Sequence, residues 1–284
     1  MAITIQDISK LREMTGAGMM DCKKALDEAN GDTDKATEIL RKKGVIKAAK
    51  RGDKIAAEGL TVVKVQNDVA VIAEVNSESD FAAKSDDFKN LVSFVADYLI
   101  ENKPASVEEA MKGLQDKFSE TVSKIGEKLN LRRIAVINKS AEENFGAYVH
   151  MGGKISVLVV LEGGSEDLAR EIAMHAAATG PRYLNREEVD GSVLEKEQEI
   201  ASEQLRAQGK PENIIVNIVK GKMDKFYSEV CLFEQPFIKD EEKTIGQLAE
   251  TAGAKVKLFW RYELGDGITK KSCDFATEVA EQMK

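Results

Sequence analysis

The chain has 284 residues, 43% of them hydrophobic, which is enough for two or more domains with buried cores. Its 41 Lys and Arg against 49 Asp and Glu give a net charge of -8, which disfavours direct binding to a nucleic-acid backbone. No window approaches the roughly 20 consecutive apolar residues of a membrane span, so a membrane protein is also excluded.

The cysteines and the first residues bear on the cellular compartment. Cys22, Cys231 and Cys273 are odd in number and far apart, which fits reduced thiols better than a disulfide framework or a zinc site. The first residues are too polar for a secretory signal, and the first expected helix begins too early for a transit peptide. We therefore expect a soluble cytoplasmic protein.

Residues 1–54 are predicted to form a small helical domain that ends in a linker. The first helix is marked by apolar residues three positions apart, namely Ile5, Ile8, Leu11 and Met14. The Thr-Gly-Ala-Gly sequence at 15–18 ends it, and two further helices are expected, one over 19–29 and one capped by Asp32 or Thr33. Three short helices with a Gly-rich first turn resemble the ubiquitin-associated domain fold.

Met19 and Met20 stand beside that Gly-rich turn. Two adjacent residues of a helix cannot both face the core, so at least one of them should be exposed. An exposed Met beside a tight turn is typical of an adaptable protein contact. We expect Leu11, Met19 and Met20 to form the partner-binding patch of the helical domain.

The third helix is expected to end at Leu40, where a basic run begins. From Arg41 to Lys54 seven residues are basic and one, Asp53, is acidic. A solvated helical linker explains this composition, because the run is rich in helix-forming residues. The alternative is a contact with an acidic patch on a partner.

A first core subdomain is predicted over residues 55–140. Its expected elements are strands at 60–65 and 69–75, helices at 87–100 and 106–129, and a strand at 132–138. A second core subdomain is predicted over residues 141–264. It begins with strands near 145–150 and 155–161 and a helix from Glu166.

The second subdomain also carries an expected insertion of two helices at about 184–228, capped by Asn185 or Asp190 and turned at 209–211. These helices are either a projecting antiparallel hairpin or ordinary core helices. Strands at 230–233 and 254–263, separated by a helix at 245–252, complete this subdomain. A C-terminal module over 265–284 ends in an amphipathic helix at 275–283.

The order of strand, loop and helix in the first subdomain recurs in the second. Twelve positions separate Val75 from Asp87, whereas six separate Leu161 from Asp167, so the first copy carries six additional residues. These residues fall on the segment around Phe81.

Phe81 is a lone aromatic in this polar connection, so it either folds inward or is offered to a partner. Because the second copy makes its turn without the extra residues, folding does not need them, which favours a functional role.

No constellation of residues supports enzyme chemistry. His150 and His175 lack Cys or carboxylate neighbours at metal-ligand spacing, and the sequence at 152–155 (Gly-Gly-Lys-Ile) is not a phosphate-binding loop. A hydrolase that used Asp80 and Asp86 would need a base and a bound metal that the sequence does not offer. We therefore expect no catalytic residue, no metal and no cofactor, and a protein that is not an enzyme.

Five segments together carry a family resemblance, in order and in spacing. They are LREMTGAGMMDCKKAL at 11–26, NGD at 30–32, EVN followed by SDF within 74–81, AMH at 173–175 and QPF at 235–237. The chain resembles bacterial elongation factor Ts from about residue 5 to the C-terminus.

The resemblance implies a guanine-nucleotide exchange factor for elongation factor Tu that works in translation elongation. It implies an α+β fold with an N-terminal three-helix ubiquitin-associated-like module, a duplicated α+β core with antiparallel sheets, an inserted helical hairpin or coiled coil, and a C-terminal helix. The factor would act on GDP and magnesium bound to its partner, with no cofactor of its own. Some members of this family form homodimers.

The family's Thr-Asp-Phe-Val segment disturbs the magnesium and phosphate side of the partner's nucleotide site. Here the segment is Ser-Asp-Phe-Ala, and the implied partner-binding residues are Asp80, Phe81, Ala82, Ala83 and Lys84. Ala82 in place of Val removes apolar contact of roughly 1.6 kcal/mol at most.

A ubiquitin-associated-like adaptor without exchange activity is the alternative. It would explain residues 1–54 but not the duplicated core.

Overall fold

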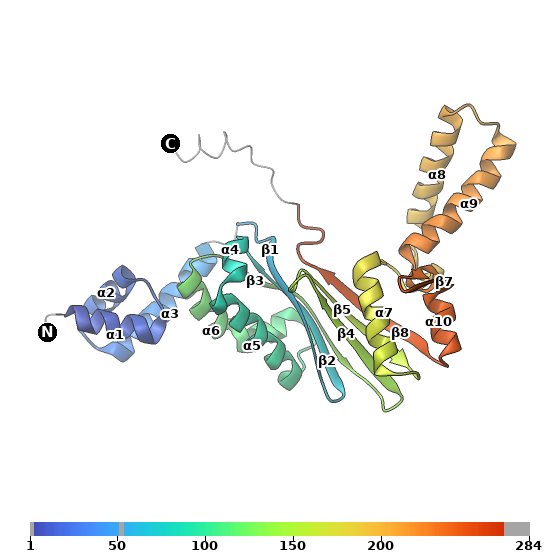
Figure 1. Cartoon of the computed structure of the whole chain (residues 1–284). Helices are drawn as coiled ribbons and strands as arrows, with labels where there is room; N and C mark the ends of the chain where they lie inside the picture. Colours follow the sequence, from blue (N-terminus) through green and yellow to red (C-terminus); the bar gives the residue numbers. More distant parts are fainter. Residues whose placement is uncertain (1–2, 51–53, 270–284) are drawn as a thin grey trace. The chain divides into compact units, whose positions relative to one another are not determined.

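The structure, a computed structural model, describes residues 3–50 and 54–269. Its helices and antiparallel strands (Figure 1) confirm the α+β class expected from the sequence. The chain divides into two compact units. One contains the chain up to Val62, Ala73–Ala135 and the segment from Glu263, and the other contains Val63–Ile72 and Val136–Tyr262.

Three helices make up the N-terminal module: α1 (Ile5–Thr15), α2 (Met19–Glu28) and α3 (Thr33–Lys50). α1 begins in a capping box, because Thr4 Oγ1 accepts from the Asp7 N–H at 3.2 Å and the Asp7 carboxylate accepts from the Thr4 N–H at 3.0 Å. It ends at Gly16, whose φ of 67° is left-handed and suits glycine. Small and aliphatic side chains form the module's core: Leu11, Ala17, Cys22, Ala25, Leu26, Ala29, Ala36 and Leu40.

α3 continues past Leu40, where the sequence predicted its end, to Lys50. No proline interrupts the basic run, so the helical hydrogen bonds can continue. Its first three cations pair within the same unit: Arg41 with Asp116 at 2.5 Å, Lys42 with Glu38 at 2.8 Å and Lys43 with Glu28 at 2.6 Å. The described start of the linker is therefore helical and charge-paired, and residues 51–53 lie outside the described residues.

The first sheet has three strands in the order β1-β2-β3: β1 (Glu58–Gln66), β2 (Val69–Ser77) and β3 (Leu129–Asn138). Two helices that pack on each other lie between β2 and β3 in the chain, α5 (Asp86–Asn102) and α6 (Val107–Ile125). α6 is shorter than predicted, because Gly126 adopts a φ of 79° and ends it. The chain can therefore re-enter the sheet at Leu129.

A fully buried carboxylate, Glu74 on β2, ties three segments of the first unit together. It accepts hydrogen bonds from Arg132 at 3.1 Å, Arg133 at 2.6 Å, the Asn76 amide at 3.0 Å and the Gly265 N–H at 2.9 Å. Burial alone would raise the pKa of Glu74, but these donors outweigh it and lower the pKa below its ordinary value. The charge is therefore compensated, and it links β2, β3 and the segment around Gly265.

The second sheet has the order β4-β5-β8: β4 (Glu143–His150), β5 (Ile155–Glu162) and β8 (Lys255–Glu263). β4 and β5 are antiparallel, with Ala147 opposite Leu158. The helix α7 (Glu166–Thr179) packs against these two strands (Figure 1) and buries its apolar face in their core. In the second copy of the predicted repeat, the strand is β5, the helix is α7, and the short turn between them joins Glu162 to Glu166.

The strand predicted over 230–233 is wrong. The helix α9 (Glu212–Val230) continues through Val230, and Leu232–Glu234 form a short 3-10 helix, η2. Between them, the backbone of Cys231 forms an isolated β-bridge with Tyr183. A short buried apolar run has the same pattern in a strand and in a helix end, so periodicity could not separate them. The chain continues through β6 (Pro236–Phe237), β7 (Asp240–Thr244) and α10 (Ile245–Thr251).

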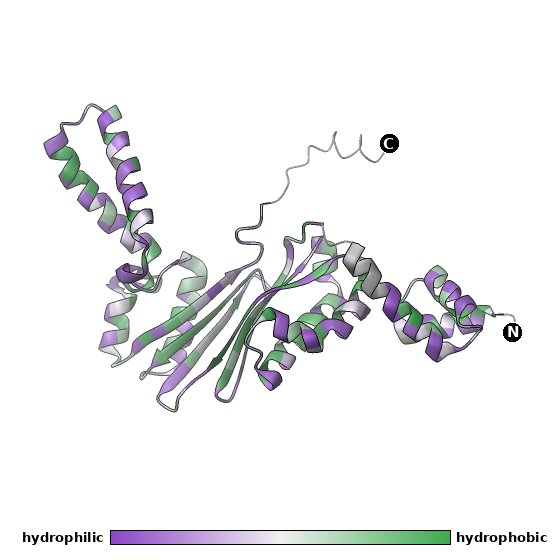
Figure 2. Ribbon diagram, turned by 180° about the vertical axis from the view of Figure 1, so that it is seen from behind, coloured by the Kyte–Doolittle hydropathy of each residue, from purple (hydrophilic) through white to green (hydrophobic). Residues whose placement is uncertain are grey.

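The predicted insertion is an antiparallel helix pair, α8 (Gly191–Ala207) and α9 (Glu212–Val230), which follows the short η1 (Arg186–Glu188). Asp190 caps α8 by accepting from the Ser192 N–H at 2.7 Å. Figure 2 shows hydrophobic residues concentrated in the first half of α9, and α8 is mostly hydrophilic. At the base, Arg186 pairs with Glu234 and Asp224, and its guanidinium lies 4.3 Å from the centroid of the Tyr227 ring.

None of the helices in the described part of the chain combines the length and apolar character needed to cross a bilayer. The helix predicted over 275–283, with Cys273 and most of the module expected from residue 265, lies outside the described residues.

His175 gives the second unit a pH-dependent core contact. Its ring is fully buried. The neutral form satisfies both nitrogens, since Nε2–H donates to Gln235 Oε1 at 3.0 Å and Nδ1 accepts from the Ile238 N–H at 3.4 Å. Burial lowers the pKa of His175 below its ordinary value of 6.5, and the hydrogen bond to Gln235 offsets only part of this effect.

We expect stability from His175 to be complete above pH 6.5 and to be lost as the pH falls below that value, because the unfolded chain then binds the proton first. The slope from this group should approach about 1.4 kcal/mol per pH unit. Urea unfolding of the wild type and of His175→Gln at several pH values would measure it. A difference between the two proteins that does not change with pH would contradict the assignment.

Two glycines inside helices offer a matched pair. A Cβ on Gly221 of α9 would meet nothing within 4 Å, whereas one on Gly113 of α6 would lie 2.2 Å from the Tyr98 hydroxyl. Gly221→Ala should stabilise the hairpin by about 1 kcal/mol through helix propensity. Gly113→Ala should destabilise α5 and α6 by about 1–3 kcal/mol, because Tyr98 must move. Thermal melts followed by circular dichroism should shift in opposite directions, and equal shifts would contradict the packing described.

Candidate functional site

The connection between β2 and α5 contains a short helix, α4 (Asp80–Lys84), where the sequence predicted a polar loop. Ser79 caps its start, since Ser79 Oγ accepts from the Ala82 N–H at 3.2 Å. Ser85 closes it with an N–H that donates to the Ala82 carbonyl at 3.1 Å. Ser85 Oγ in turn accepts from the Phe88 N–H at 3.3 Å and caps α5. The extra segment of the first copy is therefore an ordered turn of helix.

α4 turns its aromatic side chain outward and its small side chains inward. Phe81 is 82% exposed, the highest value among the large hydrophobic residues that stand exposed in the described chain. Ala82 and Ala83 are 6% and 4% exposed. An exposed Phe forgoes about 1.5–3 kcal/mol of burial, so its position makes sense when a partner covers it.

The charged residues of α4 are paired with each other. Lys84 Nζ donates to Asp80 Oδ2 at 2.7 Å and also lies 5.9 Å from the centroid of the Phe81 ring. The hydrogen bond from Lys84 lowers the pKa of Asp80, which keeps the carboxylate ionised. The exposed face of α4 thus presents one aromatic ring with a negative and a positive group beside it.

Two carboxylates that the sequence pattern did not predict hold the start of α4. Glu127 accepts from the Ser79 N–H at 2.9 Å and from the Ser79 hydroxyl at 2.7 Å. Glu78 accepts from the Lys128 N–H at 2.6 Å. The partners lie 48 and 50 positions apart in the chain, so no local spacing could have revealed them.

The N-terminal module places its three predicted contact residues differently. Met19 and Met20 are both exposed, at 53% and 65%, beside the Gly-rich turn. Leu11 is fully buried in the module's core, so it cannot touch a partner at the surface. The three-residue spacing found the side of α1 on which Leu11 is buried, although Ile5 and Met14 of the same row are 79% and 58% exposed. The candidate patch of this module therefore contains the two Met residues without Leu11.

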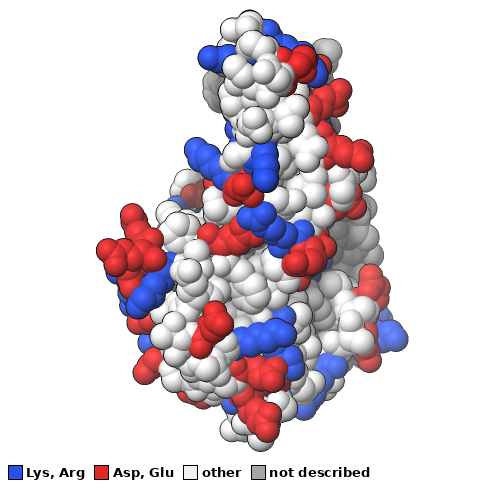
Figure 3. Space-filling view, turned by 90° about the vertical axis from the view of Figure 1, so that its right-hand side faces the viewer, with Lys and Arg blue, Asp and Glu red and all other residues white. Residues whose placement is uncertain are grey.

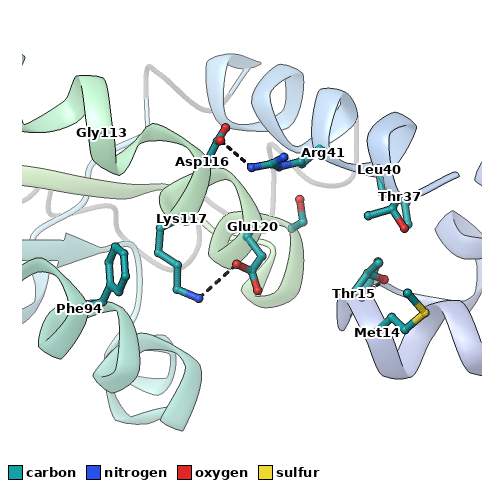
Figure 4. A pocket seen from close by; sticks show the side chains of 12 residues that line it. Met14, Thr15, Thr37, Leu40, Arg41, Phe94, Gly113, Asp116, Lys117 and Glu120 are labelled. Carbon is teal, nitrogen blue, oxygen red and sulfur yellow. Dashed lines mark hydrogen bonds and ion pairs between the residues drawn. The ribbon is translucent and has the colours of Figure 1, made fainter. Parts of the chain in front are cut away.

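A cleft of about 420 Å³ is lined by residues of α1, α3, α5 and α6 beside the contact between α3 and α6 (Figure 4). Met14, Leu40 and Phe94 give it an apolar lining. Its charges are paired across or along the walls: Arg41 with Asp116 at 2.5 Å, and Lys117 with Glu120 at 3.2 Å. Because these charged side chains are paired with each other, the lining of the cleft does not indicate which kind of ligand it would bind.

Charge on the face seen in Figure 3 is mixed. Lys and Arg side chains are interspersed with Asp and Glu, and neither sign forms a continuous track there. Within the described residues, no group of three or more His, Cys, Asp or Glu is placed to hold a metal ion. His150 instead lies beside Tyr148, with 3.4 Å between the Tyr148 hydroxyl and Nδ1 of His150.

Comparison with known families gives a match over residues 78–266 to a family model described as Elongation factor TS. The match covers more than half of the chain. It begins two residues before α4 and includes Phe81, Glu127 and the helix pair α8 and α9. The N-terminal module lies before the matched range.

Proposed function

The chain belongs to the elongation factor Ts family, and on this premise we propose that it acts as a guanine-nucleotide exchange factor for elongation factor Tu in translation elongation. It binds the GDP complex in the cytoplasm and promotes GDP release so that GTP can bind. The observation that carries this proposal is the 82% exposure of Phe81 on a capped and anchored helix.

Exchange of this kind requires differential binding and no catalytic side chain. A protein that binds nucleotide-free elongation factor Tu more tightly than its GDP complex weakens GDP by the same factor. Burying one Phe yields about 1.5–3 kcal/mol, which corresponds to about ten- to a hundredfold in affinity. Phe81 supplies this energy if its pocket exists only when the magnesium and phosphate side of the nucleotide site is displaced. The protein is then not an enzyme and needs no cofactor.

The other residues of α4 take distinct parts in this proposal. Asp80 brings a carboxylate toward the ligands of the partner's magnesium, and the partner must compete with Lys84 for it. Ala82 and Ala83 are buried, so they seat α4 and do not offer contact area. The replacement of the family's Val by Ala82 should therefore act on this seating.

Met19 and Met20 support a second contact, through the N-terminal module. Their exposure also suits an adaptor that binds proteins without exchanging nucleotide. The adaptor leaves the ordered α4 and its exposed Phe81 without a role, so exchange is the better account. Release of labelled GDP from elongation factor Tu, with and without this protein, separates the two.

We expect Phe81→Ala to slow stimulated GDP release at least tenfold, because a loss of 1.4 kcal/mol from the displaced state has that effect. The fold should survive, since Phe81 is exposed. Stopped-flow release of fluorescent GDP at saturating factor would measure it. Phe94→Ala is the matched control, because Phe94 is also exposed and has Lys117 Nζ at 5.8 Å from its ring centroid. A folded Phe81→Ala protein that releases GDP at the wild-type rate would refute the proposed role of Phe81 in exchange.

Replacing Met19 and Met20 together with Ala should weaken binding to elongation factor Tu about thirtyfold, because two buried contacts each contribute on the order of 1 kcal/mol. Titration calorimetry would report the affinity. Met14→Ala serves as the control, since Met14 is 58% exposed in the same module but lines the cleft beside α6. Equal affinities for the double variant and the control would show that Met19 and Met20 are not part of the interface.

A further inference from the structure

We propose that Glu127 is a positioning residue for exchange, which fixes the start of α4 so that Phe81 is held in one orientation. This inference rests on the proposed function, because it concerns the segment that would act on elongation factor Tu. Glu127 would not touch the partner's nucleotide site itself. Its effect would pass through Ser79 and α4 to the Phe81 ring.

Glu127 is well placed to act as a fixed point. α6 ends at Ile125 and is capped by Gly126, whose N–H donates to the Val122 carbonyl at 2.8 Å, and β3 begins at Leu129. Only three residues join the helix to the strand, so the position of Glu127 is set by both elements. The connection is held further by Glu78, which accepts from the Lys128 N–H at 2.6 Å.

The contact between Glu127 and Ser79 uses both donors of the serine. One carboxylate oxygen accepts from the Ser79 N–H at 2.9 Å and the other from the Ser79 hydroxyl at 2.7 Å. Hydrogen bonds to an ionised carboxylate are about twice as strong as neutral ones, and two of them fix direction as well as distance. Ser77 Oγ donates to the Ser79 carbonyl at 2.9 Å, which adds a restraint on the same residue.

Ser79 transmits this restraint to α4 because it is the helix cap. A helix of five residues is too short to be stable alone, so its orientation depends on tertiary contacts. Glu127 provides the contact at its start, and the buried side chains of Ala82 and Ala83 provide the contact along its inner face. Phe81 follows the cap by two residues, so the direction of its side chain is sensitive to the two hydrogen bonds between Ser79 and Glu127.

A fixed ring binds better than a mobile one. A side chain that is already ordered loses less conformational entropy when a partner covers it. Without Glu127 the Ser79 donors would turn to water, α4 would fray, and Phe81 would sample orientations that miss its pocket. The loss should appear in exchange although the cores of both units keep their packing.

The test is a double-mutant cycle on stimulated GDP release from elongation factor Tu, at saturating factor and well below the melting temperature. We expect Glu127→Ala to slow release at least fivefold in the wild-type background and to add nothing in the Phe81→Ala background. Glu127→Gln keeps an acceptor for the Ser79 N–H and should recover part of the rate. Glu120→Ala is the control, since Glu120 pairs with Lys117 and Lys124 on α6 and has no bond to Ser79.

Hydrogen exchange supplies a readout that does not depend on the partner. The amides of Ala82 and Ala83 should exchange at least fivefold faster in full-length Glu127→Ala, with unchanged protection in β4 and β5. Should Glu127→Ala fail to fold, Glu127→Gln and Ser79→Ala carry the same comparison.

Each outcome decides a separate point. Slow release by Phe81→Ala with normal release by Glu127→Ala would overturn this inference and leave the proposed function standing. Slowing by Glu127→Ala that adds to that of Phe81→Ala would also overturn it, since Glu127 would then act by another route. Normal release by Phe81→Ala would overturn the proposed function and this inference together.

Discussion

The two hydrogen bonds from Ser79 to Glu127 are the constraint on which the presentation of Phe81 depends. Phe81 is 82% exposed and gains little burial from its own fold, so its orientation comes from the contacts that hold α4, namely the Ser79 hydrogen bonds at its start and the buried Ala82 and Ala83 along its inner face. The Ser79 hydrogen bonds join the end of β2 to the turn between α6 and β3. Rigid secondary structure thereby supports a helix of five residues that is too short to be stable alone.

The same principle of compensated charge recurs on β2. Glu74 is buried four residues before Glu78, and its donors come from β3 and from Gly265. Leaving such a carboxylate without its partners would cost several kcal/mol, so these segments must stay together in the folded unit. The strand β2 is therefore held by the ion pairs of Glu74, and the segment that follows it is held by the hydrogen bonds between Ser79 and Glu127.

Much of this could be predicted from the sequence, because it depends on local pattern. The six-residue excess over the repeat located α4, and the capping residues and glycines placed most helices near their observed ends. Apolar spacing also found Leu11, although it marked a core position and not a contact surface. Met19 and Met20 were singled out by adjacency, and both are exposed.

What the sequence could not supply are contacts between distant segments. No local sequence pattern around Glu127 indicates that its carboxylate accepts hydrogen bonds from Ser79, which lies 48 positions earlier. The strand predicted over 230–233 was wrong for a related reason. Whether such a buried apolar run forms a strand or the end of a helix depends on the residues that pack against it in space. Family membership rests on the match over residues 78–266, and the role of each residue rests on chemistry that binding measurements can test.

The proposed exchange activity requires this protein to bind nucleotide-free elongation factor Tu more tightly than the GDP and magnesium complex. Calorimetric titration of both forms measures that difference directly, and GDP affinity with and without the protein provides the reciprocal quantity. We expect a preference of at least tenfold for the nucleotide-free form, matched by an equal weakening of GDP binding. Equal affinities for the two forms would contradict it.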